Sequence, residues 1–250
     1  MLIKRGVFMA VFTYAYKIRY SDVGVDNKLT LKSLVSILQE SAISHSNSVG
    51  FGINSANETH LAWLLLNWKV QMFSHPHCEE ELTVKTWPRV FDRLYSFRDF
   101  EVYDKDCNLV AIASSKWFPI DTLTKKIKKI TSEITDPYGE PVAKSVFKEP
   151  FKDKIVVPED LELNFSYTIQ RRDIDTNGHV NNLHYIDFAL ETLNEEIYNE
   201  NEFNNLEVIY KKEIKYKDNI NCYYSFEDDK HIITIKNEDD SIVHAIVKLY

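Results

Sequence analysis

Residues 169–192 read IQRRDIDTNGHVNNLHYIDFALET, and a similar plan occurs earlier in the chain as IRYSDVGVDNKLTLKSLVSILQES at residues 18–41. At a constant offset of 151 positions and without a gap, apolar and acidic residues of the two segments coincide. The pairs are Ile18 with Ile169, Asp22 with Asp173, Val23 with Ile174, Leu29 with Val180 and Glu40 with Glu191. Each segment passes from a short strand through a turn rich in Asp, Gly and Asn into a helix, so we expect two tandem copies of one unit.

Each copy contains one helix with a single apolar face. We expect the first helix over residues 30–49 and the second over residues 180–197, because their apolar residues recur three or four positions apart. In the first helix these residues are Leu31, Leu34, Val35, Leu38 and Ala42, and in the second they are Val180, Leu183, Ile186, Leu190, Leu193 and Ile197. Gly50 and Gly52 should end the first helix.

Four strand-like segments follow each helix. They are rich in β-branched and aromatic residues and are separated by turn residues. The segments are 61–73, 81–91, 95–104 and 109–121 in the first copy, and 206–216, 220–228, 231–237 and 241–250 in the second. We therefore predict an α+β fold in which each copy is a helix covering an antiparallel sheet. The expected domains are 1–139 and 161–250, joined by a proline-containing linker at 140–160.

The composition is that of a globular protein of 250 residues, with 44% hydrophobic and 27% charged residues. Its 30 basic and 38 acidic residues give a net charge of −8, which argues against a nucleic-acid-binding surface. Three scattered cysteines suit a reducing compartment. The sequence contains no run of about 18 apolar residues, which a membrane span would need. The apolar run at 6–12 is short for a secretory signal, so we interpret it as the approach to a first strand in a cytoplasmic protein.

The most unusual stretch is residues 171–182, where Asp175, Asn177 and His179 alternate before the second helix. Asp and Asn are common helix caps, and capping explains one or two of these residues. In an extended segment, alternation would place all three polar side chains on one side, close to the positive end of the helix. The stretch is therefore either a cap or a catalytic site that polarises a carbonyl group.

The run DIDTNGHVNNLHYIDFALE closely resembles the signature of acyl-acyl-carrier-protein (acyl-ACP) thioesterases, the plant and bacterial enzymes that end fatty-acid synthesis. Their motif D-x-N-x-H-V-N-N-x-x-Y is matched at every fixed position from Asp175 to Tyr185. The first copy has further family segments: Tyr16, Arg19 and Asp22, LAWLLLNWKV, TWPR at 86–89 and SSKWFPIDTLTKKIKKI at 114–130. The resemblance implies a tandem double hot dog, packed as a pseudodimer, that hydrolyses acyl-ACP to free fatty acid and ACP without a cofactor or metal.

The resemblance assigns the catalytic roles to Asp175, Asn177, His179 and Glu213. In the family a cysteine often follows the glutamate, and Ile214 occupies that position here. The implied mechanism is therefore attack by an activated water, with Glu213 as general base and His179 sharing or relaying the proton. Asn177 positions the water or the carbonyl, Asp175 orients the neighbouring side chains, and a backbone N–H at the start of the second helix polarises the thioester. If Glu213 is the base, it should be buried so that its pKa is raised. Whether Glu213 or Asp175 is the base stays open.

Three basic clusters interrupt the acidic background, and they are either solvated faces or a docking surface for the acidic ACP. The first contains Arg171 and Arg172, the second Lys125, Lys126, Lys128 and Lys129, and the third Lys211 and Lys212 with Lys215 and Lys217. The first copy of the motif, Gly24–Lys28, lacks the D-x-N-x-H pattern, so one site is expected, with the first domain supplying the acyl pocket. His75–Cys78 suits a turn better than a metal site.

Two other functions stay open. A hot-dog thioesterase acting on acyl-CoA would use the same chemistry on a different carrier. A non-catalytic acyl-binding module is the third reading, and the intact Asp175, Asn177, His179 and Glu213 set argues against it. The acyl chain length cannot be read from the sequence, and a monomeric pseudodimer and a homodimer are both compatible with it.

Overall fold

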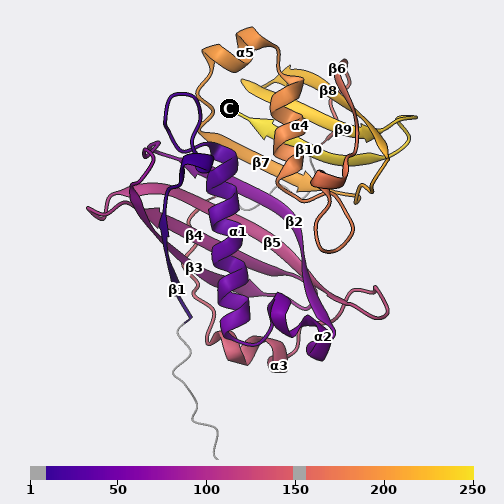
Figure 1. Ribbon diagram of the computed structural model, residues 1–250. Coiled ribbons are helices and arrows are strands. Elements are labelled where there is room, and N and C mark those ends of the chain that lie inside the picture. The colour runs from indigo at the N-terminus through magenta and orange to yellow at the C-terminus, as the bar shows by residue number, and fades with distance from the viewer. Residues whose placement is uncertain (1–9, 149–155) are drawn as a thin grey trace, which may run out of the picture. The chain divides into compact units, whose positions relative to one another are not determined.

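The computed structural model describes residues 10–148 and 156–250 (Figure 1). Its contacts divide the chain into two compact units. Unit 1 comprises residues 1–66 and 72–149, and unit 2 comprises residues 67–71 and 150–250. Most of the apolar run at 6–12 lies outside the described residues, and the first strand begins at Phe12. The domain boundaries predicted above stay a prediction.

Unit 1 is a sheet covered by one long helix. Its strand order is β1-β3-β4-β5-β2, and β1–β3, β3–β4 and β4–β5 pair antiparallel. The strands are β1 Phe12–Lys17, β2 Leu61–Met72, β3 Glu81–Phe91, β4 Ser96–Tyr103 and β5 Leu109–Asp121. Helix α1, Leu31–Ser48, lies across this sheet (Figure 1), and two short helices, α2 Ala56–Thr59 and α3 Ser132–Thr135, follow it in the chain.

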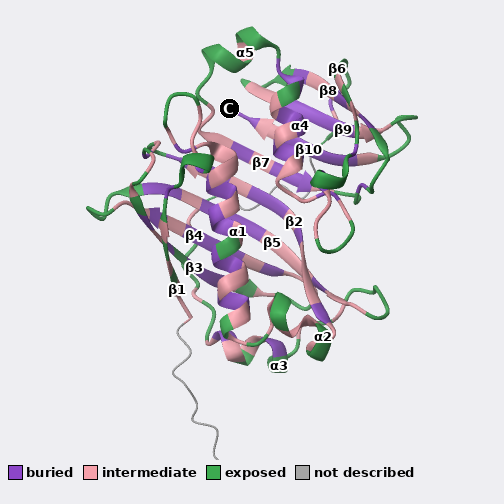
Figure 2. Ribbon diagram, viewed as in Figure 1, coloured by how far each residue is buried: buried purple, intermediate pink, exposed green. Residues whose placement is uncertain are grey.

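Helix α1 confirms the helix predicted over residues 30–49. The Thr30 hydroxyl caps it by accepting a hydrogen bond from the Ser33 N–H at 3.1 Å. Leu34, Val35 and Leu38 are fully buried, as the apolar stripe predicts. Figure 2 shows buried residues along the strands and helices of each unit, and exposed residues mainly in the loops between them.

Unit 2 repeats this architecture with a shorter helix. Its strands are arranged in the order β7-β10-β9-β8-β6, all antiparallel to their neighbours, and residues 67–71 of β2 pair with β7. The strands are β6 Glu162–Thr168, β7 Asn205–Tyr210, β8 Asn219–Glu227, β9 Lys230–Asn237 and β10 Val243–Leu249. Helices α4, His184–Thr192, and α5, Glu195–Glu200, complete the unit.

The prediction of one continuous helix over residues 180–197 is wrong. Val180 forms an isolated β-bridge with Ile174, and α4 starts only at His184. The chain breaks again at Leu193, whose backbone is extended, and the Asn194 side chain then caps α5 by accepting from the Ile197 N–H at 2.8 Å. Apolar periodicity continues through both breaks because the turn residues also face the core: Val180 is 3% exposed.

The internal repeat is confirmed in the backbone geometry. In each unit a short 3-10 turn leads into an isolated bridge that closes a tight loop, and the residue after the loop donates its N–H to the carbonyl of a buried aspartate. In unit 1 the bridge is Val23–Leu29, the Gly24 N–H donates to the Lys28 carbonyl at 2.9 Å, and the Thr30 N–H donates to the Asp22 carbonyl at 3.1 Å. In unit 2 the bridge is Ile174–Val180, the Asp175 N–H donates to the His179 carbonyl at 2.8 Å, and the Asn181 N–H donates to the Asp173 carbonyl at 2.8 Å.

The start of the predicted linker lies against unit 1. The Val146 N–H donates to the carboxylate of Asp99 at 3.1 Å, and Asp99 is itself fully buried beside Arg89. The indole of Trp87 donates to the Lys144 carbonyl at 3.2 Å. Residues 140–148 are therefore fixed on the sheet by hydrogen bonds, whereas residues 149–155 of the predicted linker lie outside the described residues.

Candidate active site

Three of the predicted site residues share one tight loop in unit 2. One carboxylate oxygen of Asp175 accepts hydrogen bonds from the N–H groups of Asn177 at 2.8 Å and His179 at 3.4 Å. The other oxygen accepts from the Asn177 side-chain amide at 3.3 Å. Gly178 has φ of +80°, a conformation that glycine adopts readily. The loop is therefore closed around Asp175, and the expectation of an extended segment is wrong because the carboxylate bonds the chain back on itself.

Glu213 lies in the loop that follows β7, next to the loop that carries Asp175. The Val180 N–H donates to the Ile214 carbonyl at 2.9 Å, which joins the two loops through residues adjacent to His179 and Glu213. The structure corrects two expectations: β7 ends at Tyr210, so Glu213 is not on a strand, and the Glu213 side chain is exposed rather than shielded. Among the described residues, no hydrogen bond to its carboxylate is formed.

Tyr185 is a buried residue within electrostatic range of both carboxylates of this site, and sequence reasoning gave it no role. Its side chain is 3% exposed, and burial raises the pKa of its phenol, which the neighbouring charges of Glu213 and Asp175 raise further. Both carboxylates therefore lie within electrostatic range of one buried hydroxyl. Tyr185 is the last fixed position of the motif D-x-N-x-H-V-N-N-x-x-Y, and this fixed position is the feature of the sequence that points to a role for it.

A second tyrosine supports the first. The rings of Tyr185 and Tyr210 meet edge to face with centroids 5.2 Å apart, an arrangement that aromatic pairs favour. The Tyr210 hydroxyl donates to the Asn182 carbonyl at 3.0 Å, so it ties the end of β7 to the turn before α4. The buried Tyr185 and the half-buried Tyr210 therefore pack together between the two loops of the site.

Three of the backbone N–H groups at the expected start of the second helix already have hydrogen-bond partners. The Val180 N–H is bonded to Ile214, and the Asn181 N–H donates to the Asp173 carbonyl at 2.8 Å. The Leu183 N–H donates to the Asn181 side chain at 3.0 Å. These three groups cannot polarise a thioester carbonyl without losing a present partner, and the role expected for this helix end stays a prediction.

A thiol route through the nearest cysteine in the chain has no support either. Cys222 lies on β8, is fully buried, and burial raises the pKa of its thiol to about 12. The thiol is therefore protonated near neutral pH.

The predicted basic clusters are divided between the units. In unit 2, Arg171 and Lys217 both lie over the ring of Tyr216, with 5.7 and 5.5 Å from each cation to the ring centroid, and Arg171 also bonds the Tyr216 hydroxyl at 3.3 Å. Arg172, Lys211 and Lys212 are exposed in the same unit. The cluster of Lys125, Lys126, Lys128 and Lys129 follows β5 in unit 1, where the Lys128 ammonium donates to the Thr59 carbonyl at 3.3 Å.

The His75–Cys78 segment connects β2 to β3, and the His75 ring bonds the Leu29 carbonyl at 3.1 Å. Within the described parts of the chain, no group of three or more His, Cys, Asp or Glu side chains is arranged to hold a metal ion. Over the same residues, no helix combines the length and apolar character that crossing a bilayer requires.

Comparison with known proteins gives two matching family models that together cover most of the chain. Residues 9–138 match the acyl-ACP thioesterase N-terminal domain, and residues 158–248 match the acyl-ACP thioesterase C-terminal domain. Among curated relatives, the chloroplastic oleoyl-ACP thioesterase 2 of Arabidopsis thaliana is 26% identical over 89% of this chain, and a palmitoyl-ACP thioesterase of the same plant is 27% identical over 81%. The chain spans 65% and 52% of the lengths of these two relatives.

Solved structures agree with the family models. An acyl-ACP thioesterase from Bacteroides thetaiotaomicron is 26% identical, with a TM-score of 0.78 over 96% of this chain and 97% of that one. The 12:0-ACP thioesterase of Umbellularia californica, at 20% identity and a TM-score of 0.78, covers 98% of both chains and shows the same fold. The prediction of two hot-dog units in tandem is thereby confirmed. With both family domains present in order along one chain, the protein belongs to the acyl-ACP thioesterase family.

Proposed function

We propose that this protein hydrolyses acyl-ACP to free fatty acid and ACP and so terminates fatty-acid synthesis. The observation that carries the proposal is the intact loop of Asp175, Asn177 and His179 held beside Glu213 in unit 2 of a chain that belongs to this family. The substrate is a thioester on the phosphopantetheine arm of ACP, and water is the second reactant. The free cysteines suit a reducing compartment, and we place the protein in the cytoplasm.

We assign the general base to Glu213 rather than to Asp175. All three hydrogen bonds that Asp175 accepts come from its own loop, so this carboxylate is occupied in shaping the loop. Glu213 is exposed and free of such bonds among the described residues, which leaves both of its oxygens available to a water molecule. His179, half-buried in the loop, relays the proton, and the Asn177 amide orients the water or the carbonyl.

The exposure of Glu213 gives the bound substrate a part in catalysis. An exposed carboxylate is a weak base near neutral pH, and removal of water from around it raises its pKa. We propose that the acyl-phosphopantetheine arm covers Glu213 on binding and removes water from around its carboxylate. The adjacent buried Tyr185 already supplies a non-aqueous surface on one side.

The basic surface of unit 2 is our candidate for docking the acidic carrier. Arg171 and Lys217 are held by the ring of Tyr216, in the segments that flank the Asp175 and Glu213 loops. The net charge of −8 repels an acidic carrier as a whole, so a local cluster of this kind must steer association. Arg171→Ala together with Lys217→Ala should raise KM for acyl-ACP and flatten its dependence on salt, with kcat unchanged.

The test of the function is thiol release from acyl-ACP and from acyl-CoA that carry the same acyl chain. Wild-type protein should release ACP thiol faster, and Glu213→Gln and His179→Ala should each lower kcat by about 10² or more, the usual size of acid–base contributions. Asp26→Asn, in the corresponding loop of unit 1, is the matched control and should leave kcat unchanged.

Three outcomes would decide against parts of this proposal. Faster turnover of acyl-CoA would make the protein an acyl-CoA thioesterase. Binding of acyl-ACP without thiol release would make it an acyl-binding module. Near-normal kcat in Glu213→Gln, with the wild-type unfolding temperature, would remove Glu213 from the role of base.

A further inference from the structure

His244 is a buried histidine near the candidate site that the mechanism above does not use. It lies on β10, is 4% exposed, and lines a cavity of about 620 Å³ together with Glu213. The other lining residues of this cavity are polar or charged apart from Ile242. All of them belong to unit 2.

The backbone at His244 forms a β-bulge. In the pairing of β10 with β9, Val243 faces Lys236 and Ala245 faces Ile235, so His244 is the extra residue. On its other side, the His244 carbonyl accepts two hydrogen bonds, from the N–H groups of Lys211 at 2.8 Å and Lys212 at 3.1 Å. Bulges redirect a side chain and end regular pairing. This one ends the β7–β10 ladder just before Glu213.

The ring of His244 adds a third bond to the same segment. Its Nδ1 lies 3.1 Å from the Lys212 carbonyl oxygen, and a carbonyl only accepts, so Nδ1 carries the proton. Burial lowers the pKa of His244. The carbonyls of Lys212 and Glu213 and the charge of Asp218 raise this pKa but do not cancel the effect of burial, so the ring is neutral. Nε2 is then an acceptor, and it is buried without a hydrogen-bond partner among the described residues.

A buried acceptor without a partner costs free energy, which an apolar residue at this position would avoid. What the imidazole supplies here, and an apolar side chain would not, is the Nδ1–H bond to Lys212. We propose that His244 is a positioning residue for the thioesterase reaction: its bulge and its Nδ1–H fix the Lys211–Glu213 segment and so hold the Glu213 carboxylate where it meets the water. This role rests on the function proposed above.

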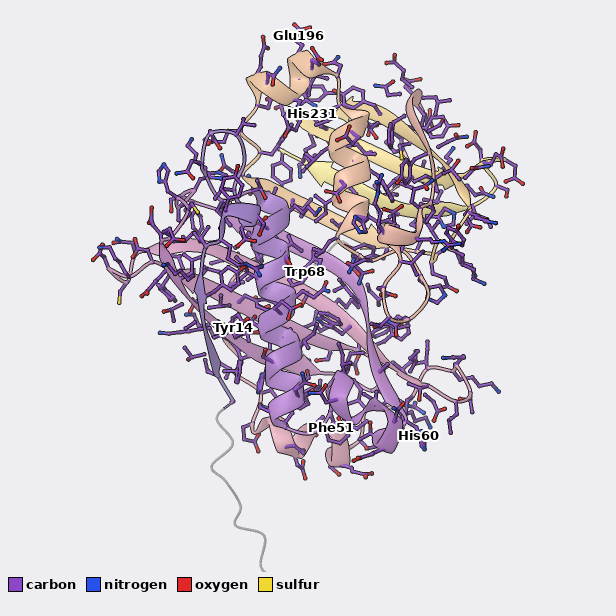
Figure 3. All side chains as sticks on the ribbon, viewed as in Figure 1. Tyr14, Phe51, His60, Trp68, Glu196 and His231 are labelled. Atoms are coloured by element: carbon purple, nitrogen blue, oxygen red, sulfur yellow. The ribbon has the colours of Figure 1, made fainter. Side chains whose placement is uncertain are left out.

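Two substitutions separate the ring bond from simple packing. In His244→Asn the side-chain amide nitrogen takes the place of Nδ1 and can still donate to the Lys212 carbonyl. In His244→Gln the amide lies at the level of Nε2 and the bond is lost. Both variants are neutral and polar, so their folding penalties are similar. His231→Asn is the control: this histidine, labelled in Figure 3, lies on β9 and bonds Tyr224.

We expect His244→Gln to lower kcat for acyl-ACP by about tenfold or more with KM within about twofold, and His244→Asn to stay within about threefold of wild type. In a Glu213→Gln background, His244→Gln should add little further loss, because the two act through one group. Equal losses in both His244 variants, or additive losses in the double variant, would overturn the proposal.

A measurement on the wild-type protein keeps the proposal testable if His244→Gln fails to fold. Nitrogen-15 NMR of the histidine rings should show His244 in the Nδ1–H form, and an Nε2–H form would overturn the assignment. The failures are distinguishable: an inactive wild-type protein refutes the proposed function, whereas an active wild type with unaffected His244→Gln refutes only the role of His244.

Discussion

Substitutions at Asp175 test whether this carboxylate orients the loop or acts as the catalytic base. Asp175→Ala removes all three hydrogen bonds that close the loop, of which the bond at 2.8 Å is short and those at 3.3 and 3.4 Å are long. Taking about 1 kcal/mol for the short bond and about 0.5 kcal/mol for each long one gives a loss of about 2 kcal/mol in holding His179 and Asn177. At about 1.4 kcal/mol per factor of ten, kcat should fall about 30-fold.

Asp175→Asn tests the same residue without its charge. The amide oxygen can still accept from the two backbone N–H groups, and only the bond from the Asn177 side chain is lost. About 0.5 kcal/mol corresponds to a two- to threefold loss of kcat. The assay is ACP-thiol release under saturating acyl-ACP, with the unfolding temperature measured in parallel to confirm that each variant is folded.

The two possible bases give opposite rank orders. If Asp175 orients the loop, Glu213→Gln is much slower than Asp175→Asn, and Asp175→Ala lies between them. If Asp175 is the base, Asp175→Asn and Asp175→Ala are equally slow, because neither has a carboxylate, and Glu213→Gln stays active. This second pattern would refute the assignment made above.

Two further predictions concern the loop geometry and the core of unit 1. Gly178→Ala should destabilise the loop by about 1 kcal/mol because φ is +80°, although no atom crowds a new Cβ. Gly178→Asn should destabilise the loop less, since Asn27 adopts φ of 63° at the matching position of unit 1. Thiol-release rates of the two variants compare these effects. The Nδ1 of buried His45 lies 3.0 Å from the Arg98 guanidinium, and burial, followed by that charge, lowers the pKa of His45 from 6.5 to about 3. Because the unfolded chain binds this proton first, the free energy of unfolding should fall as pH drops from about 6.5 to about 3, and denaturant titrations of His45→Gln should show a smaller fall.

The sequence predicts the α1 helix well because one pattern decides it. Leu34, Val35 and Leu38 form a stripe that only a helix places on one face, and Thr30 and Gly50 mark the ends. The second helix was predicted too long because burial alone creates the same spacing. Val180 packs into the core from a β-bridge, and periodicity does not distinguish that from a helical turn.

The site was identified by a motif, and the parts outside the motif were not found. His244 is 31 residues from Glu213 in the chain and meets it only through the pairing of β10 with the segment after β7. No local spacing reports such a contact. The expected burial of Glu213 followed from the chemistry of a general base and not from any residue pattern, since Lys211, Lys212 and Glu213 are three consecutive charged residues. The strand β7 ends at Tyr210, before these residues, and Glu213 is exposed.

Unit 1 shows which features of the site are needed for folding. Its loop closes through the Gly24 N–H and the Lys28 carbonyl at 2.9 Å, as the loop of unit 2 does, although Gly24 occupies the position of Asp175. The Leu29 N–H bonds the Pro76 carbonyl where the Val180 N–H bonds Ile214, so the position of Glu213 corresponds to His75.

The same backbone frame therefore forms with Gly24 in place of Asp175 and His75 in place of Glu213, although Asp26 in the unit 1 loop accepts a hydrogen bond from the Lys28 N–H at 3.1 Å. Folding of this frame does not require the Asp175, His179 and Glu213 set, and Asp175→Ala should leave unit 2 folded. The exposed carboxylate of Glu213, beside the buried Tyr185 and an aspartate at the position that Gly24 occupies in unit 1, is then explained by chemistry in unit 2 rather than by stability.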